Sequence, residues 1–533
     1  MFLRRVPVRV SCCMSVSSVD EVAVDGTGRT VPESGRSALR SISDLPGPRG
    51  LPLLGNGLRL LPLSRAHLTA EAWCERYGPI FQFHAGRRRW VAIADQDAIN
   101  ALLRDRPEGF RRLREMERAW EEPGFAGVFS VEGETWKRQR GLVVRALNAN
   151  HLHRRYEVIQ TATRRLQRRL RERARSGESF AITRLFTSFS VDIASTLAFG
   201  HDLNTLERGE VELQAHIERV TWMLAFRSFF PFPYWRFFQL PVDRACKRSV
   251  LEVRAAVARF VEQARAQMRQ RPQLRECPEN FLQAMLAAQE QDSTFTDAEI
   301  VGNVYTLLFA GEDTTAHSMA WTVWFLAQRP DIQARLAQES AVVLGEEPCP
   351  ADHEVVSRFA YGEAVLRESM RLKPVSVWDS YEPLADTTIC GARIPAGTRV
   401  VLLKRHVSRS AGGPAFDPER WLDHDEREAP DQKSFLNFGA GPRFCPGRNL
   451  AFLEAKSALA MIARDFEIEL DDSHGPVKES FSITMIPKGL RVRLRERAPG
   501  SPAVPAGMGD RRGCVVSETS FAHRTAANML ATS

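Results

Sequence analysis

Apolar residues recur at helical spacing along most of the chain, whereas strand-like alternation is confined to a few short segments. A helix is predicted over 66–77, a long apolar helix over 298–328, and a last helix over 449–464. A pair of short strands is predicted at 80–84 and 90–94, and further strand-like segments at 387–394 and 398–403. The pattern therefore predicts a mainly α protein with small β-sheets.

The two ends of the chain lack this periodicity. Residues 1–43 are rich in Ser, Val, Gly and Arg, and residues 496–533 in Pro, Gly, Ala and Ser, so both segments are predicted to be disordered. Three prolines make 45–56 a stiff extended lead-in. One domain over 44–495 is expected, and Met14 is an alternative start of the chain.

Charge changes this picture little. The net charge is +8, and 65 of the 73 basic residues are Arg, which is typical of a GC-rich genome rather than of a selected phosphate-binding surface. No basic run is interleaved with base-stacking aromatics, so nucleic-acid binding is not expected. A basic patch that meets an acidic protein is the better interpretation.

The nine cysteines are odd in number and irregularly spaced, with no Cys-x-x-Cys pair. A structural zinc site and a disulfide scaffold are therefore not expected, and a reducing cytoplasm is the natural compartment. No run of 18 apolar residues occurs, and residues 1–10 are too short and too charged for a secretory signal. We expect a soluble protein without a membrane span.

The sequence around one cysteine favours a thiolate that could ligate a metal. Cys445 follows Phe-Gly-Ala-Gly-Pro-Arg-Phe and precedes Pro-Gly, immediately before the predicted last helix. Glycines allow backbone N–H groups to approach the sulfur, and a helix N-terminus favours a thiolate. A lone cysteine is more often a small buried apolar residue, so the surrounding pattern has to decide.

Five positions of this segment, Phe438, Gly441, Arg443, Cys445 and Gly447, match the signature of the cytochrome P-450 family, which the chain resembles over about 44–495. The resemblance implies a fold of a dozen or so helices with a smaller β-rich lobe. It implies haem b between the long central helix and the cysteine loop, with Cys445 as the iron ligand. Phe438 would pack near the sulfur, and Arg443 would bind a haem propionate.

Glu368 and Arg371 have the i, i+3 spacing of residues that share a helix face, which alone is a weak signal. In context they resemble the Glu-x-x-Arg motif of the same family, whose third member would be Arg420. The implied role is structural, because this buried triad braces the loop that carries the thiolate.

The long helix contains Ala310-Gly-Glu-Asp-Thr-Thr315, a polar sequence inside an apolar pattern. One interpretation is a threonine that bonds its i−4 carbonyl and bends the helix. The other rests on the resemblance: Gly311 makes room over the haem, and Asp313 and Thr314 form the acid–alcohol pair that delivers protons for O–O cleavage. The two interpretations do not exclude each other.

Trp136 and Arg140 resemble the family's Trp-x-x-x-Arg element, in which both side chains reach a haem propionate. One position departs from the pattern. Within 374–386 the family usually has a propionate-binding Arg, and here the aligned residue is Tyr381, so one positive charge is lost.

By resemblance, Tyr305, Phe309, Ala310 and Val375 would line the substrate pocket. The segment 222–240 is rich in aromatic residues and fits a core or lid cluster, an apolar entrance, or a membrane-touching patch. An apolar ligand is favoured in each case, and fatty acids, terpenoids and polyketide-like scaffolds are all admissible.

The resemblance implies a bacterial-type monooxygenase of secondary metabolism that puts one atom of O₂ into a C–H or C=C bond. Peroxide-driven or isomerase-type haem-thiolate chemistry, and a non-catalytic haem sensor or carrier, are the alternatives. A fused reductase domain is not expected, so electrons from NAD(P)H would come through a separate reductase and a ferredoxin- or flavodoxin-type carrier. The carrier would meet a basic face around Lys137, Arg138 and Arg448. A monomer is expected.

Overall fold

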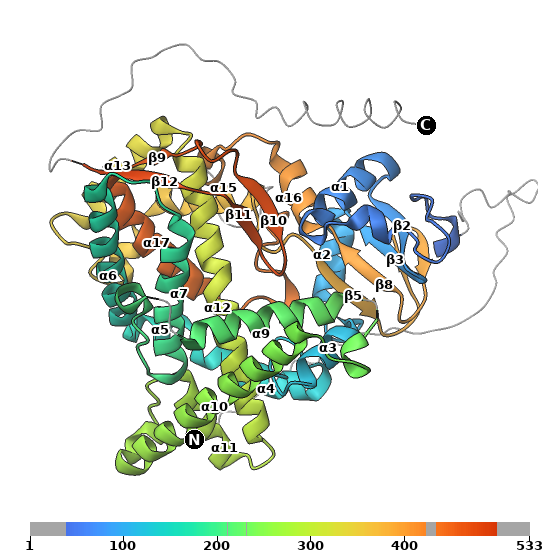
Figure 1. Ribbon diagram of the computed structural model, residues 1–533, viewed down its shortest axis with the longest axis horizontal. Helices are drawn as coiled ribbons and strands as arrows, with labels where there is room; N and C mark the ends of the chain where they lie inside the picture. Colours follow the sequence, from blue (N-terminus) through green and yellow to red (C-terminus); the bar gives the residue numbers. More distant parts are fainter. Residues whose placement is uncertain (1–38, 210–211, 231, 423–432, 498–533) are drawn as a thin grey trace, which may run out of the picture.

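The computed structural model describes residues 39–209, 212–230, 232–422 and 433–497 (Figure 1). The α-helices are α1 (Ala66–Tyr77), α2 (Gln96–Arg104), α3 (Arg114–Glu121), α4 (Gly133–Ala146), α5 (Ala149–Arg154), α6 (Tyr156–Ser176), α7 (Ile182–Phe199), α8 (Thr205–Arg208), α9 (Glu212–Phe229), α10 (Pro241–Gln270), α11 (Phe281–Gln291), α12 (Asp297–Leu326), α13 (Pro330–Leu344), α14 (His353–Ser357), α15 (Ala360–Leu372), α16 (Lys404–Gly412) and α17 (Arg448–Asp465). The strands are β1 (Arg40–Ser41), β2 (Ile80–Ala85), β3 (Arg88–Ile93), β4 (Phe110–Arg112), β5 (Asp379–Pro383), β6 (Thr387–Ile389), β7 (Ala392–Ile394), β8 (Arg399–Leu402), β9 (Phe466–Leu470), β10 (Lys478–Phe481), β11 (Met485–Lys488) and β12 (Val492–Glu496). The predicted class, mainly α with small sheets, is confirmed.

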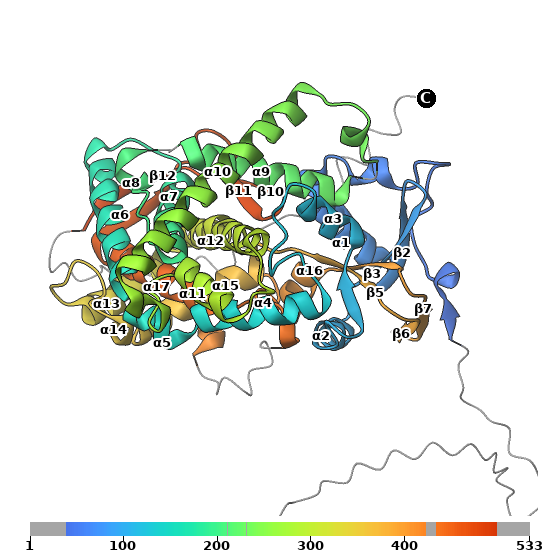
Figure 2. The same ribbon diagram turned by 90° about the horizontal axis from the view of Figure 1, so that it is seen from below.

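The helix α12 passes through the middle of a large helical lobe. In Figure 2 it is seen nearly end-on with α7, α9, α11, α15 and α17 around it. Its N-terminus carries a capping box, in which the Thr296 side chain accepts from Glu299 N and the Glu299 side chain accepts from Thr296 N. Most of its residues are buried on every side, which is why a continuous apolar pattern predicted it within two residues at each end.

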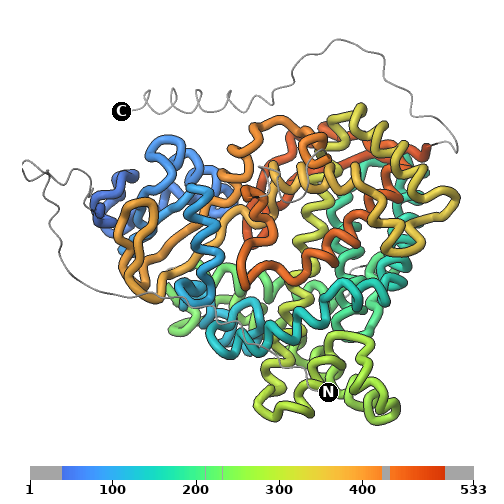
Figure 3. Tube along the Cα trace, turned by 180° about the vertical axis from the view of Figure 1, so that it is seen from behind, coloured from blue at the N-terminus to red at the C-terminus, as the bar shows by residue number. Residues whose placement is uncertain are grey.

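A smaller lobe holds a five-stranded sheet in the order β2-β3-β8-β5-β4, with α1 and α2 nearby. The strand β8 pairs in parallel with β3, so segments about 300 residues apart in sequence lie side by side, as the blue and orange traces of Figure 3 show. The β2–β3 hairpin predicted from alternation is confirmed. Gly86 forms its turn at φ +60°, where an L-residue would be strained.

The prediction of one strand over 387–394 was wrong. The segment folds back on itself as the β6–β7 hairpin, with Ile389 opposite Ala392. The two turn residues, Cys390 and Gly391, have φ +47° and +71°, as a tight two-residue hairpin requires. A cysteine at such a position is uncommon, so the sequence carried only half of the usual turn signal.

The ordered domain begins slightly earlier than the predicted boundary of residue 44. Arg40–Ser41 form β1 and pair in parallel with β7, which corrects the expectation of disorder for these residues. At the other end, Arg497 donates from Nε to Phe466 O over 3.1 Å, two residues beyond the predicted limit of 495. Residues 42 and 43 of the predicted N-terminal tail lie in a 3-10 turn, Ile42–Asp44, and Glu496 of the predicted C-terminal tail ends β12. Met14 and the other tail residues, 1–38 and 498–533, lie outside the described residues. In the part of the chain that the structure describes, no helix combines the length and apolarity needed to cross a bilayer.

Glu368, Arg371 and Arg420 meet where α15 packs against the 412–421 segment. Glu368 and Arg371 are fully buried and form two parallel hydrogen bonds of 2.8 Å, and Arg420 Nε donates to Glu368 Oε1 over 3.1 Å. Trp421 Nε1 and Asp417 N also donate to the Glu368 carboxylate. Arg371 in turn donates to the carbonyls of Gly413 and Ala415. One carboxylate and one guanidinium thus fix the 412–421 segment on α15.

A second buried network fastens the β-rich lobe to the helical lobe. Glu479 of β10 accepts from Lys373 Nζ (2.5 Å) and Arg405 Nη2 (2.7 Å), and its other oxygen lies 3.1 Å from His67 Nε2. Burial alone would raise the pKa of Glu479, but the bond from His67 and the charges of Arg405 and Lys373 lower it well below its ordinary value. The network joins α1, α15, α16 and β10.

Substituting Glu368 by Ala should lower the free energy of unfolding by about 3–5 kcal/mol, because Arg371 would remain as an uncompensated buried charge. The matched control is Glu134→Ala, which breaks an exposed i, i+3 pair with Lys137 and should cost no more than about 1 kcal/mol. Urea unfolding followed by circular dichroism measures both, and equal losses would contradict the assigned importance of the buried pair.

The stability contribution of Glu479 should depend on pH. Its folded-state pKa is depressed, so the contribution is complete above the unfolded-state value of about 4.3 and is lost as pH falls below it. Glu479→Gln should therefore be less stable than the unsubstituted protein at pH 7, and the difference should shrink between about pH 5 and pH 3. Thermal unfolding across this range tests it, with the exposed Glu467→Gln as control. A difference independent of pH would disprove the linkage.

Candidate functional site

The loop that carries Cys445 is shaped by its glycines and by the end of α2. Gly441, at φ +68°, begins a 3-10 turn, and a Cβ there would lie 2.6 Å from Leu103 O. Only glycine allows this approach, which seats the loop against α2. Cys445 N donates to Phe438 O over 2.8 Å, and α17 begins three residues later. The Phe438 ring lies 5.6 Å from Phe452 and 6.4 Å from Phe444.

The Cys445 sulfur lies in a mixed electrostatic environment. The residue keeps some exposed surface but lies deep in the fold, so burial raises the pKa of its thiol. Backbone N–H groups of Gly447 and Arg448 and the charges of Arg140 and Lys404 act in the opposite direction. The N–H donors that the sequence predicted are therefore present, but they do not offset burial. A metal cation bound to the sulfur would favour the thiolate.

Two buried guanidinium groups near this loop are short of negative charge. Arg106 lies 3.6 Å from Glu132, and Arg443 donates to the same carboxylate. Arg106 Nε and Nη2 and Arg443 Nε and Nη1 have no hydrogen-bond acceptor among the described residues. Burial lowers the pKa of Arg443 to about 9; Glu132 opposes this, and the charges of Arg106 and Arg112 add to it. Such a cluster is suited to an anionic ligand.

Trp136 and Arg140 lie beside this cluster, but their side chains contact different groups. The Trp136 ring lies 4.4 Å from the Arg443 guanidinium carbon, as in a cation–π contact. Arg140 Nη2 donates to Phe444 O, next to the cysteine. In this structure Trp136 therefore supports Arg443, and Arg140 fastens the loop.

Tyr381, expected at the position of a family arginine, packs against a cation from another segment. The Arg106 guanidinium carbon lies 4.1 Å from the Tyr381 ring centre. Tyr381 is buried, which raises the pKa of its phenol to about 12, so it stays neutral. A positive charge is therefore present beside Tyr381, carried by Arg106 from a different segment of the chain.

Sequence reasoning missed Arg106, Arg112 and Glu132. Nothing in their local pattern distinguishes them from the many other arginines and glutamates of this arginine-rich chain. Arg112 stacks on Phe129 at 4.1 Å and donates from its backbone to Glu132. Only tertiary folding brings these residues to Arg443.

The polar sequence of α12 presents different groups to different neighbours. Thr314 Oγ1 donates to Ala310 O over 2.7 Å, so the back-bonding interpretation is correct for this structure. Thr314 and Asp313 are partly exposed and Ala310 is exposed. Asp313 Oδ1 lies 3.8 Å from His317 Nε2, one turn further along the helix.

The role expected for Gly311 needs correction. A Cβ at Gly311 would lie 3.1 Å from the Ala194 Cβ of α7, which is tighter than ordinary contact. Gly311 therefore serves the close crossing of α12 and α7 rather than clearing space for a ligand. Ala310 is the small residue of this turn that has an open surface.

The four residues expected to line a pocket differ in burial. Ala310 is exposed and Val375 half-buried, whereas Phe309 and Tyr305 are buried. Tyr305 stacks on Phe125 at 4.2 Å, and its hydroxyl lies 2.9 Å from Thr221 Oγ1 of α9. Phe309 lies 5.1 Å from Trp120 and 5.5 Å from Phe129. Tyr305 is therefore part of a buried aromatic cluster and does not itself reach an exposed surface.

The aromatic segment after α9 is mostly not core. Phe226, Tyr234 and Trp235 form a half-buried cluster, with ring centres 5.5 to 6.4 Å apart. Phe232, Phe237 and Phe238 are exposed, and Phe237 keeps 73% of its surface. The interpretation as a core cluster is therefore wrong for these three residues. An exposed apolar entrance or contact surface remains.

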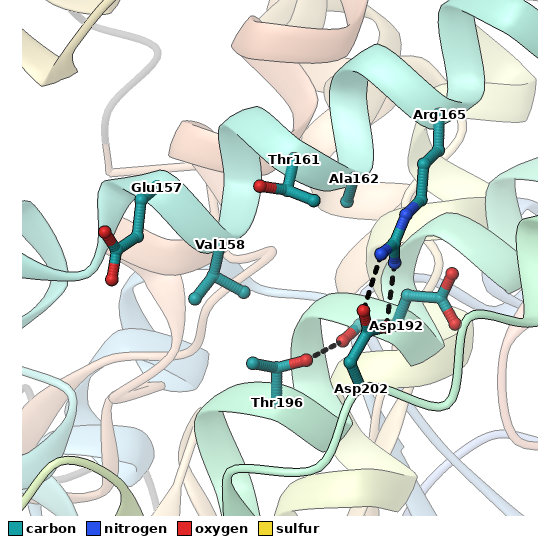
Figure 4. A pocket seen from close by; sticks show the side chains of 8 residues that line it. All are labelled: Glu157, Val158, Thr161, Ala162, Arg165, Asp192, Thr196 and Asp202. Atoms are coloured by element: carbon teal, nitrogen blue, oxygen red, sulfur yellow. Dashed lines mark hydrogen bonds and ion pairs between the residues drawn. The ribbon is translucent and has the colours of Figure 1, made fainter.

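A cavity of about 160 Å³ lies elsewhere, between α6 and α7 (Figure 4). None of the predicted site residues lines it. Its inner charged groups are already paired, because Arg165 donates to both oxygens of Asp202, and Asp192 accepts from Thr205. The remaining charged group, Glu157, is exposed to solvent, so the cavity offers no buried unpaired charge to a ligand.

The residues around Cys445 fit one kind of group. A sulfur with two N–H donors can ligate a metal cation, and Arg106 and Arg443 have donors left for carboxylates. The loop between them carries the aromatic rings of Phe438 and Phe444. A flat apolar molecule with a metal ion and two carboxylates, such as haem b, satisfies all of these features.

Comparison with known proteins agrees with this geometry. A family model described as cytochrome P450 matches residues 45–494. The chain is 30% identical over 481 residues to the mouse (Mus musculus) mitochondrial 25-hydroxyvitamin D-1 alpha hydroxylase, with 85% of this chain and 92% of the relative covered. It is 26% identical to mouse cytochrome P450 3A13 (80% and 85% covered) and 25% identical to the Caenorhabditis elegans cytochrome P450 CYP13A3 (85% and 93% covered). The chain therefore belongs to the cytochrome P450 family of haem-thiolate monooxygenases.

Proposed function

We propose that this enzyme inserts one atom of O₂ into an apolar small molecule, by hydroxylation or epoxidation, with Asp313 and Thr314 as its proton-delivery pair. The observation that carries the proposal is the partly exposed Asp313–Thr314 pair on a buried apolar helix. Their exposure on a largely buried helix would let them meet both solvent and a bound ligand. Peroxide-driven and isomerase-type relatives would have no need of this pair.

Cys445 would ligate the haem iron, and Arg106 and Arg443 would bind the propionates with the donors that lack acceptors. Phe438 would pack beside the sulfur, Trp136 would support Arg443, and Arg140 would hold the loop through Phe444 O. Bound there, haem would activate dioxygen when electrons are supplied. Glu368, Arg371 and Arg420 would brace the segment that leads into this loop.

Thr314 would hold the last proton of the delivery path. Its Oγ1–H now points to Ala310 O, so rotation about χ1 would turn the proton toward the exposed face of the helix. Asp313, partly exposed on the same turn, would resupply it from solvent. A hydroxyl suits this position because it can donate one proton while accepting another.

The substrate would be a medium or large apolar compound, of the fatty-acid, terpenoid or polyketide-like classes of secondary metabolism. Support comes from the aromatic wall of Trp120, Phe129 and Phe309 and from the exposed Phe232 and Phe237 after α9. Apolar walls of this kind hold ligands mainly by desolvation and shape.

We also propose that NAD(P)H supplies electrons through a separate reductase and a ferredoxin- or flavodoxin-type carrier. The basic face named for that carrier is partly neutralised within the protein. Lys137 pairs with Glu134 and Glu108, and Arg138 pairs with Glu299. Attraction for an acidic carrier would therefore depend on the net field of the face rather than on single free charges. A cytoplasmic location fits the six described cysteines, all of which are free thiols.

The reduced protein under carbon monoxide should show the long-wavelength Soret band of thiolate ligation. Cys445→His should move this band to the shorter wavelength of histidine ligation. Cys390→Ser, at another half-buried loop cysteine, should leave it unchanged. An unchanged band in Cys445→His would show that another residue ligates the iron.

Thr314→Ala should uncouple reductant use from product formation, lowering product per NAD(P)H by roughly tenfold or more. Lauric acid, limonene and 6-deoxyerythronolide B serve as probes of the three substrate classes, ranked first by the spin-state shift that each induces. Thr314→Ser should restore most of the coupling. Thr322→Ala, which removes a similar i−4 bond on the same helix, should leave coupling intact. Normal coupling in Thr314→Ala would refute the proton-delivery role.

A further inference from the structure

His317 lies behind Asp313 on α12 and joins it to the turn between β10 and β11. Its Nε2 is 3.8 Å from Asp313 Oδ1, and its Nδ1 is 2.9 Å from Thr484 Oγ1. The imidazole is almost fully buried, whereas the Asp313 side chain is about one-third exposed. Figures 1 and 2 both place β10 and β11 beside α12.

The β10–β11 turn is itself held firmly on this helix. Trp321 Nε1 donates to Met485 O over 2.9 Å, and Met485 N donates to Val375 O over 2.9 Å. Thr484 is therefore a fixed point, and its hydroxyl can orient the imidazole. Any proton path that includes Asp313 thus has a rigid support on its inner side.

The two partners of His317 suit one tautomer. Burial lowers the pKa of His317, with Asp313 opposing, so the ring is neutral near neutral pH and carries one proton. A proton on Nε2 would face the carboxylate oxygen of Asp313 at 3.8 Å, and Nδ1 would then accept from the Thr484 hydroxyl at 2.9 Å.

We propose that His317 is a positioning residue for proton delivery: it orients the Asp313 carboxylate through Nε2–H and is itself oriented by Thr484. The inference deepens the proposed function, because it rests on Asp313 acting as the proton donor to Thr314. Without His317, the partly exposed carboxylate would lose the one contact that the structure records for it among the described residues. It would then turn freely and support Thr314 for only part of the time.

The chain contains a matched control for this geometry. His216 of α9 has its Nδ1 2.9 Å from Ser249 Oγ and its Nε2 3.8 Å from Glu212, also one helical turn away. The distances are the same, but Glu212 is exposed and no acid–alcohol pair adjoins it. A purely structural role for such a histidine would give similar effects at both sites.

The tautomer provides a test that does not depend on turnover. In ¹⁵N-histidine NMR spectra of the reduced, carbon monoxide-bound holoenzyme, which is diamagnetic, His317 should appear as the Nε2–H tautomer, assigned by loss of its signals in His317→Gln. Thr484→Val should shift it toward a tautomer mixture, and Thr484→Ser should not. An Nδ1–H tautomer in the unsubstituted protein, or no response to Thr484→Val, would overturn the proposal.

Turnover with whichever of lauric acid, limonene and 6-deoxyerythronolide B gives the largest spin-state shift provides the second test. His317→Phe should lower product per NAD(P)H roughly tenfold, with substrate affinity little changed, and His317→Gln should recover part of it. His216→Phe should match the unsubstituted enzyme. If His317→Phe does not fold, Thr484→Val is measured in its place. Equal coupling in the His317 and His216 variants would overturn the proposal. Absence of product from the unsubstituted enzyme with all three compounds would count against the substrate classes alone, and the tautomer would still decide.

Discussion

The fully buried ion pair between Glu368 and Arg371 is the constraint around which the helical lobe is arranged. Two charges without water need every lone pair and proton satisfied, and the chain achieves this by drawing in Arg420, Trp421 and the carbonyls of 412–415. The 412–421 segment therefore has one position relative to α15. Because the cysteine loop follows this segment and α17 follows the loop, a structural ion pair fixes where the chemistry takes place.

In contrast, the region around Cys445 contains buried polar groups whose hydrogen-bonding capacity is not fully used. Cys445 has a raised thiol pKa, and Arg106 and Arg443 have buried donors without acceptors. Each feature is unfavourable for the polypeptide alone. A single ligand with a central cation and peripheral carboxylates would relieve all of them, so cofactor binding and stability should be coupled. The region therefore resembles a binding site completed by its ligand more than a finished core.

Local patterns predicted the features that local physics determines. The continuous apolar run became α12, the alternation around Gly86 became the β2–β3 hairpin, and the Glu-x-x-Arg spacing became an ion pair. Features that depend on tertiary neighbours were missed or misassigned. Gly311 faces α7, Arg140 bonds a carbonyl, and Arg106 places a positive charge beside Tyr381. No residue spacing in the sequence encodes which of 65 arginines reaches a given place.

The helix α12 explains why reaction class is easier to infer than substrate. The groups that we propose for proton delivery, Asp313, Thr314 and His317, lie within five residues, so their geometry follows from helix periodicity. The surface proposed for the substrate would instead combine α12 with α3, the loop before α4, and the segments after α9 and α15. Each would contribute apolar side chains whose shape, rather than type, decides what fits. The chemistry of one helix follows from its sequence, whereas a surface shared by five segments depends on how they pack together.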